Sequence, residues 1–188
     1  MTIDAESLGQ LVAEAREGDR VAADRLVREH AGWVRSAIYG VTARADLVDD
    51  IAQQVWARAW QHLGTLENPR QLRPWLYMIA RNTAIDVCVA ERRQQAIADR
   101  LDGQVRPADR PPASPPGVTD RRELRETLLR AVQSLPAIYR EPFVLRHLEE
   151  WSYAEIGNVL SLSAETVETR LVRARRLLRE MLQGKVEP

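Results

Sequence analysis

The segment from Trp151 to Leu182 constrains the fold more than any other part of this 188-residue chain. Ser152 and Glu155 form a capping-box pair, in which a hydroxyl and a carboxylate satisfy free amide groups at a helix start. A helix is therefore predicted to begin at Tyr153. Ser163 follows a short interruption and is the expected N-cap of a second helix. The spacing predicts a helix-turn-helix.

The second helix of this segment has two unlike faces. Apolar side chains lie along one side at helical spacing, at Val167, Leu171, Ala174 and Leu178. The other side is polar and basic, with Glu165, Thr166, Thr169, Arg173 and Arg176. From Ser163 to Arg179 there are five arginines and two glutamates, a local net charge of 5 − 2 = +3. Such a face fits the DNA major groove. The alternative is a solvated helix that packs on a bundle.

The bulk composition limits the partners of the chain. Lys+Arg and Asp+Glu both number 27, so an anionic partner must bind a local patch. Cys88 is the only cysteine and the three histidines lie far apart, so we expect no disulfide, metal or other cofactor. The N-terminus lacks a signal sequence and no apolar stretch reaches membrane-spanning length, which predicts a cytoplasmic protein without membrane insertion. The absence of a phosphate loop or nucleophile motif argues against an enzyme.

Helical spacing dominates the chain and strand signals are nearly absent, so the fold class is predicted to be all-α. Half of the ten prolines crowd between Pro107 and Pro116, next to Gly117. Such a stretch cannot form a core. We therefore expect a Pro-rich linker over 97–119, between a first helical domain at 1–96 and a second at 120–188.

Capping residues and prolines mark the expected helix starts. In the first domain these are Ser7, Asp19, Asp46 and Pro74. In the second domain Asp120 is expected to cap a helix, and Pro142 to lie in the first turn of the helix before the helix-turn-helix.

Three motifs occur in a fixed order along the chain: DLVDDIAQQVWARAWQHL at 46–63, LRPWLYMIARNTAID at 72–86, and TVETRLVRARRLL after the linker. Together with SLPAIYREPFVLRHLEEWSYAEIG they resemble the extracytoplasmic-function (ECF) group of bacterial sigma-70-type sigma factors. The resemblance covers almost the whole chain outside the linker. It implies a non-enzymatic initiation factor that binds core RNA polymerase and gives it promoter specificity. The first domain resembles sigma region 2 and the second sigma region 4.

The resemblance implies that the helix at 49–60 docks on a coiled coil of the largest polymerase subunit. Its candidate contacts are Asp50, Gln53, Gln54, Ala57 and Trp60. An exposed tryptophan is a plausible interface anchor, but Trp56 and Trp60 are equally candidates for the core.

The segment at 66–86 is implied to read and help melt the minus-ten promoter element. Its candidate contacts are Asn68, Arg70, Arg73, Arg81, Asn82 and Asp86. Asn82 offers a donor and an acceptor to a base edge, whereas the anionic Asp86 is better suited to orienting a neighbouring group. Trp75 is expected in the core.

The helix-turn-helix is implied to read the minus-thirty-five element. Thr166, Thr169 and Arg173 are the candidates for base edges. Further candidate contacts are Arg170, Arg175 and Arg176, which are expected on phosphates, and Ser163. The apolar side of the region 4-like helices is implied to contact the flap of the second-largest polymerase subunit. The resemblance also implies an anti-sigma partner.

Two departures from the family pattern stand in these motifs. Glu168 occupies a position that is usually basic, and 87–91 lacks the usual basic residues. Each lost phosphate contact would lower DNA affinity. Two other readings stay open: a stand-alone helix-turn-helix regulator that dimerises on palindromic DNA, and a pure interaction protein. Cys88 suits either inert packing or a redox role.

Overall fold

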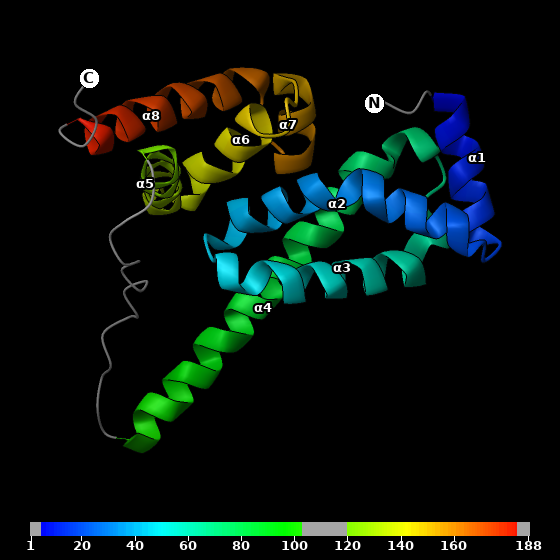
Figure 1. The fold of residues 1–188 in the computed structure, drawn as a ribbon, viewed down its shortest axis with the longest axis horizontal. Coiled ribbons are helices and arrows are strands. Elements are labelled where there is room, and N and C mark those ends of the chain that lie inside the picture. Colours follow the sequence, from blue (N-terminus) through cyan, green and yellow to red (C-terminus); the bar gives the residue numbers. More distant parts are fainter. Residues whose placement is uncertain (1–4, 103–119, 184–188) are drawn as a thin grey trace.

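The chain is all-helical in the part that the structure, a computed structural model, describes: residues 5–102 and 120–183 (Figure 1). The first half contains α1 (Ala5–Arg16), α2 (Arg20–Thr42), α3 (Val48–His62) and α4 (Leu72–Asp102), with the 3-10 turns η1 (Ala45–Leu47), η2 (Leu63–Thr65) and η3 (Pro69–Gln71). The second half contains α5 (Asp120–Ser134), α6 (Ala137–His147), α7 (Tyr153–Leu160) and α8 (Ala164–Leu182). This confirms the predicted fold class. Within the described ranges, no helix is long and apolar enough to span a membrane.

The first half is a bundle of α2, α3 and α4 with α1 against one end. Asp19 caps α2 as predicted, since its carboxylate accepts hydrogen bonds from the amides of Val21 and Ala22 at 2.7 and 3.2 Å. The apolar stripes of the three helices, which include Val34, Ile51 and Leu76, meet in the core. The bundle thus buries the faces that the helical periodicity predicted.

The second half contains the predicted helix-turn-helix. Ser152 and Glu155 form the capping box of α7, and the Ser163 hydroxyl accepts a hydrogen bond from the Thr166 amide at 3.1 Å to cap α8. Between them the chain turns at Ser161, which has a positive φ of 56°. The tightness of this turn brings the Leu162 carbonyl against Gly157. The apolar stripe of α8 is buried as predicted: Val167, Leu171, Ala174 and Leu178.

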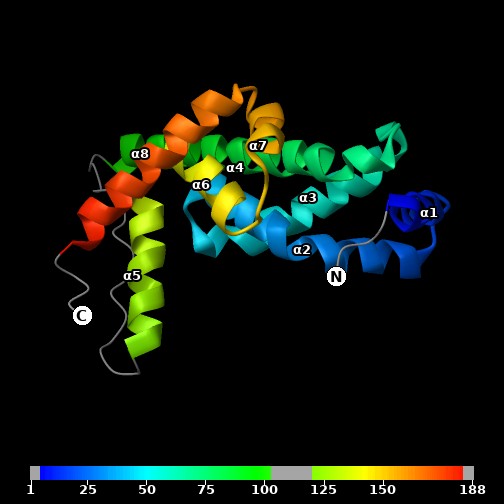
Figure 2. The ribbon, with the colours of Figure 1, turned by 90° about the horizontal axis from the view of Figure 1, so that it is seen from above.

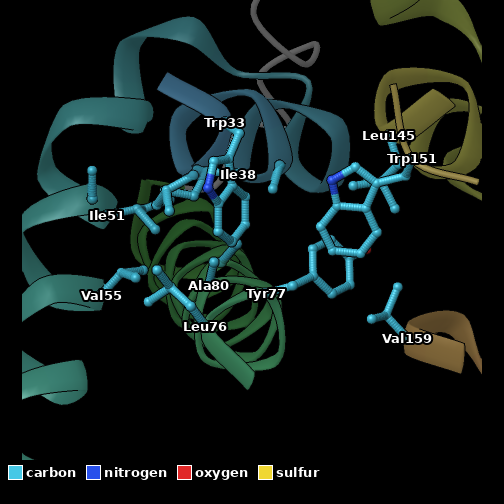
Figure 3. Packing of buried hydrophobic residues seen from close by; sticks show 14 of the residues in the cluster. Trp33, Ile38, Ile51, Val55, Leu76, Tyr77, Ala80, Leu145, Trp151 and Val159 are labelled. Atoms are coloured by element: carbon cyan, nitrogen blue, oxygen red, sulfur yellow. The ribbon is translucent and has the colours of Figure 1, made fainter. Parts of the chain in front are cut away.

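The two halves share one hydrophobic core. Trp151 of the second half is buried, with its ring centroid 6.0 Å from Trp33 and 5.6 Å from Tyr77, both of the first half (Figure 3). Figure 2 shows α6 and α7 beside α2 and α4, at the opposite end from α1. We call this contact region the seam; its residues are Trp33, Gly40, Val41, Arg73, Tyr77 and Arg81 of the first half and Arg140, Glu141, Val144, Glu149 and Trp151 of the second.

Three local predictions were wrong. Ser7 lies inside α1 rather than before it. Pro142 lies in the interior of α6, because that helix already starts after Pro136. The linker was expected from residue 97, but α4 continues to Asp102 because no glycine or proline occurs between Pro74 and Gly103. The rest of the expected linker, 103–119, lies outside the described residues.

We predict that Gly157→Ala destabilises the protein. A Cβ at this position would lie 2.6 Å from the backbone oxygen of Leu162, so the helix-turn-helix must shift to accept it. The expected loss in the free energy of unfolding is about 1–3 kcal/mol, measured by urea denaturation. Gly32→Ala on α2 is the control: a Cβ there meets nothing within 4 Å, and the change should stabilise by about 0.5–1 kcal/mol. Equal stability of the two variants would contradict the steric argument.

Candidate nucleic-acid interface

The outer face of α8 is exposed and basic. Its buried stripe fixes the helix against α6 and α7, so the opposite side points into solvent. Of the residues predicted here, Thr166 and Arg170 are half-buried and the others are exposed: Ser163, Thr169, Arg173, Arg175 and Arg176. Exposed arginines on one helix face can bind base edges or phosphates. Glu168 is also exposed on this helix, where its charge opposes close phosphate contact.

The start of this face is ordered by hydrogen bonds. The Ser163 and Thr166 hydroxyl oxygens lie 2.8 Å apart, and the Thr169 hydroxyl donates to the Glu165 carbonyl at 3.0 Å. Both contacts hold short polar side chains in fixed positions at the helix start. Their remaining lone pairs stay available to a base edge.

Val172 lies within the polar face and is 56% exposed. Sequence reasoning missed it as a candidate contact, because valine was counted with the apolar residues. On a wheel of about 100° per residue it falls about 40° from Arg176 and about 60° from Thr169, away from the buried stripe. An apolar side chain at such a place suits the methyl group of thymine.

The predicted minus-ten candidates fall into two groups. Asn68, Arg70, Asn82 and Asp86 are exposed. Asn68 caps η3, since its side-chain oxygen accepts the Arg70 amide at 3.0 Å. Asp86 pairs with Arg58 of α3 at 3.0 Å, and the same Arg58 nitrogen donates to Thr83 at 3.1 Å. Asp86 therefore orients an arginine on the surface between α3 and α4.

Arg73 and Arg81, the other two candidates, are engaged by the second half. Arg73 lies over the Trp151 ring at 4.7 Å and donates to the Glu149 carbonyl at 2.8 Å. Burial lowers the pKa of Arg73. The Arg81 guanidinium donates to Glu141 at 2.9 Å. Burial alone would lower the pKa of Arg81, but this hydrogen bond and the charge of Glu141 outweigh it and raise the pKa.

The outer face of α3 gathers the predicted polymerase contacts. Four of them are exposed: Asp50, Gln53, Gln54 and Ala57. Trp60 is half-buried, stacks on Trp56 at 5.7 Å between ring centroids and packs against the cluster formed by α1, α2 and the start of α4. Trp60 therefore packs in the core on one side, and its remaining surface is accessible beside the exposed face of α3.

An open groove of about 610 Å³ lies between α6 and α8. Its apolar lining comes from Phe143, Leu178 and Leu182, and its rim carries Arg175 and Arg179. Long apolar residues beneath basic ones can hold an amphipathic segment of another protein.

Cys88 and His30 are two of the partly buried titratable groups outside these faces. Burial raises the pKa of the Cys88 thiol, which lowers its thiolate content at neutral pH and favours inert packing over redox chemistry. His30 lies beside Trp33, with ring centroids 6.1 Å apart, and its Nδ1 is 3.0 Å from the Leu26 carbonyl. Burial lowers the pKa of His30. In the described residues, no group of histidines, cysteines and carboxylates is arranged to hold a metal.

Protein-family models match both halves of the chain. Sigma-70 region 2 matches residues 26–95, which contain α3 and most of α4. Sigma-70 region 4 matches residues 125–178, which contain the helix-turn-helix.

Curated proteins and solved structures match over nearly the full length. The chain is 31% identical over 179 residues to the RNA polymerase sigma-H factor of Pseudomonas aeruginosa, with 93% of each chain covered. It is 30% identical over 184 residues to the ECF RNA polymerase sigma-E factor of Escherichia coli, covering 95% of this chain and 93% of that one. CnrH, solved with the cytosolic domain of CnrY, matches with a TM-score of 0.66 and 25% identity over 94% of this chain and 97% of that one. The sigma factor RpoE of Bartonella quintana, solved with the anti-sigma factor NepR, shares the fold, with a TM-score of 0.65 and 21% identity over 87% and 98%.

We predict that His30 makes the protein less stable in mild acid. Its folded pKa is lowered, so below its ordinary value of 6.5 the unfolded chain takes up the proton first. The stability that neutral His30 contributes is complete above this value and is lost as the pH falls through the folded pKa. His30→Gln should therefore lose less free energy of unfolding between neutral pH and mild acid than the wild type. Urea denaturation at each pH measures this, and identical pH slopes would rule the contribution out.

Proposed function

We propose that this chain, which belongs to the ECF group of the sigma-70 family of RNA polymerase sigma factors, directs core RNA polymerase to promoters through two DNA-reading elements, one on each half. One observation carries the proposal: a region 2 match and a region 4 match occur in order in one chain, and the second ends in a helix with an exposed basic face. As a sigma factor it acts in the cytoplasm and without catalysis of its own.

The minus-thirty-five element is read by the outer face of α8. Thr166, Thr169 and Arg173 reach base edges, and Val172 adds an apolar contact to one side of them, next to Arg176. Ser163, Arg170, Arg175 and Arg176 hold the phosphates on either side. From Ser163 to Arg179 the net charge of this helix is only +3, which supports a moderate affinity for DNA, because each phosphate contact adds to binding.

The minus-ten element is read by η3 and the first half of α4. Asn68 and Asn82 present exposed amides that suit base edges, and Arg70 suits a phosphate. Arg73 and Arg81 complete the surface. Asp86 acts through Arg58, which it holds beside the DNA-reading face of α4.

Core polymerase binds on two separate surfaces. The exposed side of α3, with Gln53, Gln54 and Ala57 at its centre and Asp50 and Trp60 at its ends, docks on the coiled coil of the largest subunit. The apolar groove between α6 and α8 takes the flap of the second-largest subunit. When polymerase is bound at these two surfaces, it holds the promoter near the DNA-reading elements and so raises the effective affinity of each DNA contact. This accounts for DNA reading by a protein of zero formal net charge.

An anti-sigma protein is the proposed inhibitor. The sigma factor RpoE of Bartonella quintana was solved with an anti-sigma factor, and that protein shares the fold of this chain. The two surfaces proposed for polymerase are the surfaces an inhibitor must cover to prevent assembly.

Reconstitution with core polymerase tests the proposed function. The purified chain should direct specific transcripts from templates selected out of a random-sequence DNA library. Footprints should cover two nonpalindromic elements, and only when core polymerase is present. A palindromic footprint by the chain alone would instead support a stand-alone regulator.

Arg173→Ala should weaken binding of the holoenzyme to its selected promoter by about 1–3 kcal/mol and relax the choice of base at one upstream position. Arg175→Ala is the matched variant. As a phosphate contact it should weaken binding equally on all sequences and lower the salt dependence. Quantitative binding to a set of single-base promoter variants separates the two. Uniform loss across that set would assign Arg173 to a phosphate.

Ala57→Glu should weaken the binding of core polymerase by about tenfold or more, which corresponds to about 1.4 kcal/mol. The change places a long charged side chain at the centre of the exposed α3 face, and glutamate keeps the helix intact. Ala13→Glu, on the exposed side of α1, makes the same change away from this face. Affinity for core polymerase is measured by fluorescence anisotropy. Equal affinity of both variants would move the docking surface away from α3.

A further inference from the structure

We propose that α1 braces the turn that reads the minus-ten element, and that Arg16 is the positioning residue through which it acts. The turn comprises residues 63–71, between α3 and α4, and includes η2 and η3; we call it the reading turn. The inference rests on the proposed DNA-reading role of η3 and the first half of α4. It gives a role to a helix that precedes the region 2 match, which begins at residue 26.

The reading turn has buried side chains that anchor it and exposed side chains that can meet DNA. Leu63 and Leu66 are buried, and so is Leu72, the first residue of α4. Asn68 and Arg70, between the last two of these leucines, are exposed. The buried side chains hold the backbone that carries the exposed ones, so the positions of the DNA-reading groups depend on what the three leucines contact.

The three leucines pack against α1. They belong to one hydrophobic cluster with Leu11 and Val12, which are buried on the inner face of α1. α1 also contacts η3 directly, and Figure 1 shows it beside the connection between α3 and α4. This packing holds the turn against the body of the first half. It does not fix the path of the backbone, because apolar contacts have no preferred direction.

Arg16, the last residue of α1, makes the directional contacts. Its Nε donates to the Leu63 carbonyl at 3.2 Å, and its Nη2 donates to the Leu66 carbonyl. These residues are the C-caps of α3 and η2, and helix ends leave such carbonyls without partners. A planar guanidinium that binds two acceptors at once also fixes their relative position. Arg16 therefore sets the path of the chain as it enters the reading turn.

The rest of the reading turn is held by hydrogen bonds of its own. The Thr65 hydroxyl donates to the His62 carbonyl at 2.8 Å. The Asn68 side chain accepts the Arg70 amide at 3.0 Å, and the Asn68 carbonyl accepts the Gln71 amide at 2.8 Å. These bonds join near neighbours, whereas Arg16 joins the turn to an element 47 and 50 positions away. Its donors are engaged within the protein, so it acts through the turn and does not touch DNA.

A turn that is held before DNA arrives can capture a base at a lower cost in free energy. Binding to a mobile segment must also order that segment, and this opposes affinity. The brace removes this cost from the minus-ten step. The surfaces proposed for the minus-thirty-five element and for the polymerase coiled coil lie on α8 and on the outer face of α3, so they do not depend on it.

Arg16→Ala in reconstituted holoenzyme tests the brace, and Arg20→Ala is the matched control, which removes the same charge from an exposed site on α2. On promoter DNA that the wild-type holoenzyme selects from the library, Arg16→Ala should lower discrimination against single-base changes in the minus-ten element by about three- to tenfold. Affinity for core polymerase, discrimination at the minus-thirty-five element and the salt dependence of binding should stay at their wild-type values.

Two failures of this experiment have different meanings. Discrimination at the minus-ten element that is unchanged, or that changes equally in Arg20→Ala, would overturn the brace. If the wild-type holoenzyme selects no DNA at all, the proposed function is overturned instead.

A double-mutant cycle separates positioning from a general loss of stability. Asn68→Ser removes the amide that suits a base edge but keeps an oxygen that can cap η3. Since Arg16 acts through the turn that carries Asn68, Arg16→Ala should weaken minus-ten binding less in the Asn68→Ser background than in the wild type. Equal losses in the two backgrounds would show that Arg16 has only a structural role and would overturn the proposal.

Hydrogen exchange in the free protein tests the brace without DNA or polymerase. The Leu66 amide donates to the Leu63 carbonyl at 3.2 Å, one of the two carbonyls that Arg16 holds. Arg16→Ala should speed exchange at Leu66 by about tenfold, the factor that corresponds to about one hydrogen bond, while amides in the middle of α2 keep their wild-type rates. Equal acceleration throughout α2, α3 and α4 would indicate global destabilisation and would contradict a local brace.

Discussion

The seating of the Trp151 indole between helices of the first half is the interaction on which the arrangement of the molecule depends. An indole buries about 150–250 Å², which at about 25 cal/mol per Å² contributes up to about 4–6 kcal/mol. That is comparable with the whole stability of a small domain. The hydrogen bonds of Arg140 add direction, because they tie the last turn of α2 to the end of α5. Burial of the Trp151 indole holds the two halves together, and the hydrogen bonds of the Arg140 guanidinium fix their relative orientation.

The contacts between the two halves also occupy basic side chains that were candidates for DNA binding. Arg81, a candidate for DNA contact, donates a hydrogen bond to Glu141 across the seam. The formal charge of the chain is zero, so no long-range field draws DNA to it. Under the proposed function, recognition then depends on exposed local basic groups and on a polymerase that brings DNA close.

Local features were readable in the sequence and the seam was not. The caps at Ser152 and Ser163 and the buried stripe of α8 depend on residues three or four apart, which helical geometry alone fixes. Arg140 binds a carbonyl 100 positions away, and nothing near it in sequence marks it as buried. The motifs identified Arg73 and Arg81 as DNA-reading candidates, yet their contacts with the second half depend on tertiary packing. Val172 was missed because it was grouped with the apolar residues by its type, although its position on the helix places it on the polar face.

The end of α4 extends away from the core of the first half. From Arg92 to Ala98 the side chains are all exposed, and the helix continues to Asp102 beyond the body of the first half (Figure 1). At about 1.5 Å per residue, the eleven residues from Arg92 to Asp102 form an arm about 16 Å long. The chain therefore leaves the first half from a point already displaced from its core. Under the proposed function, this arm adds to the reach of the chain between its two DNA-reading elements.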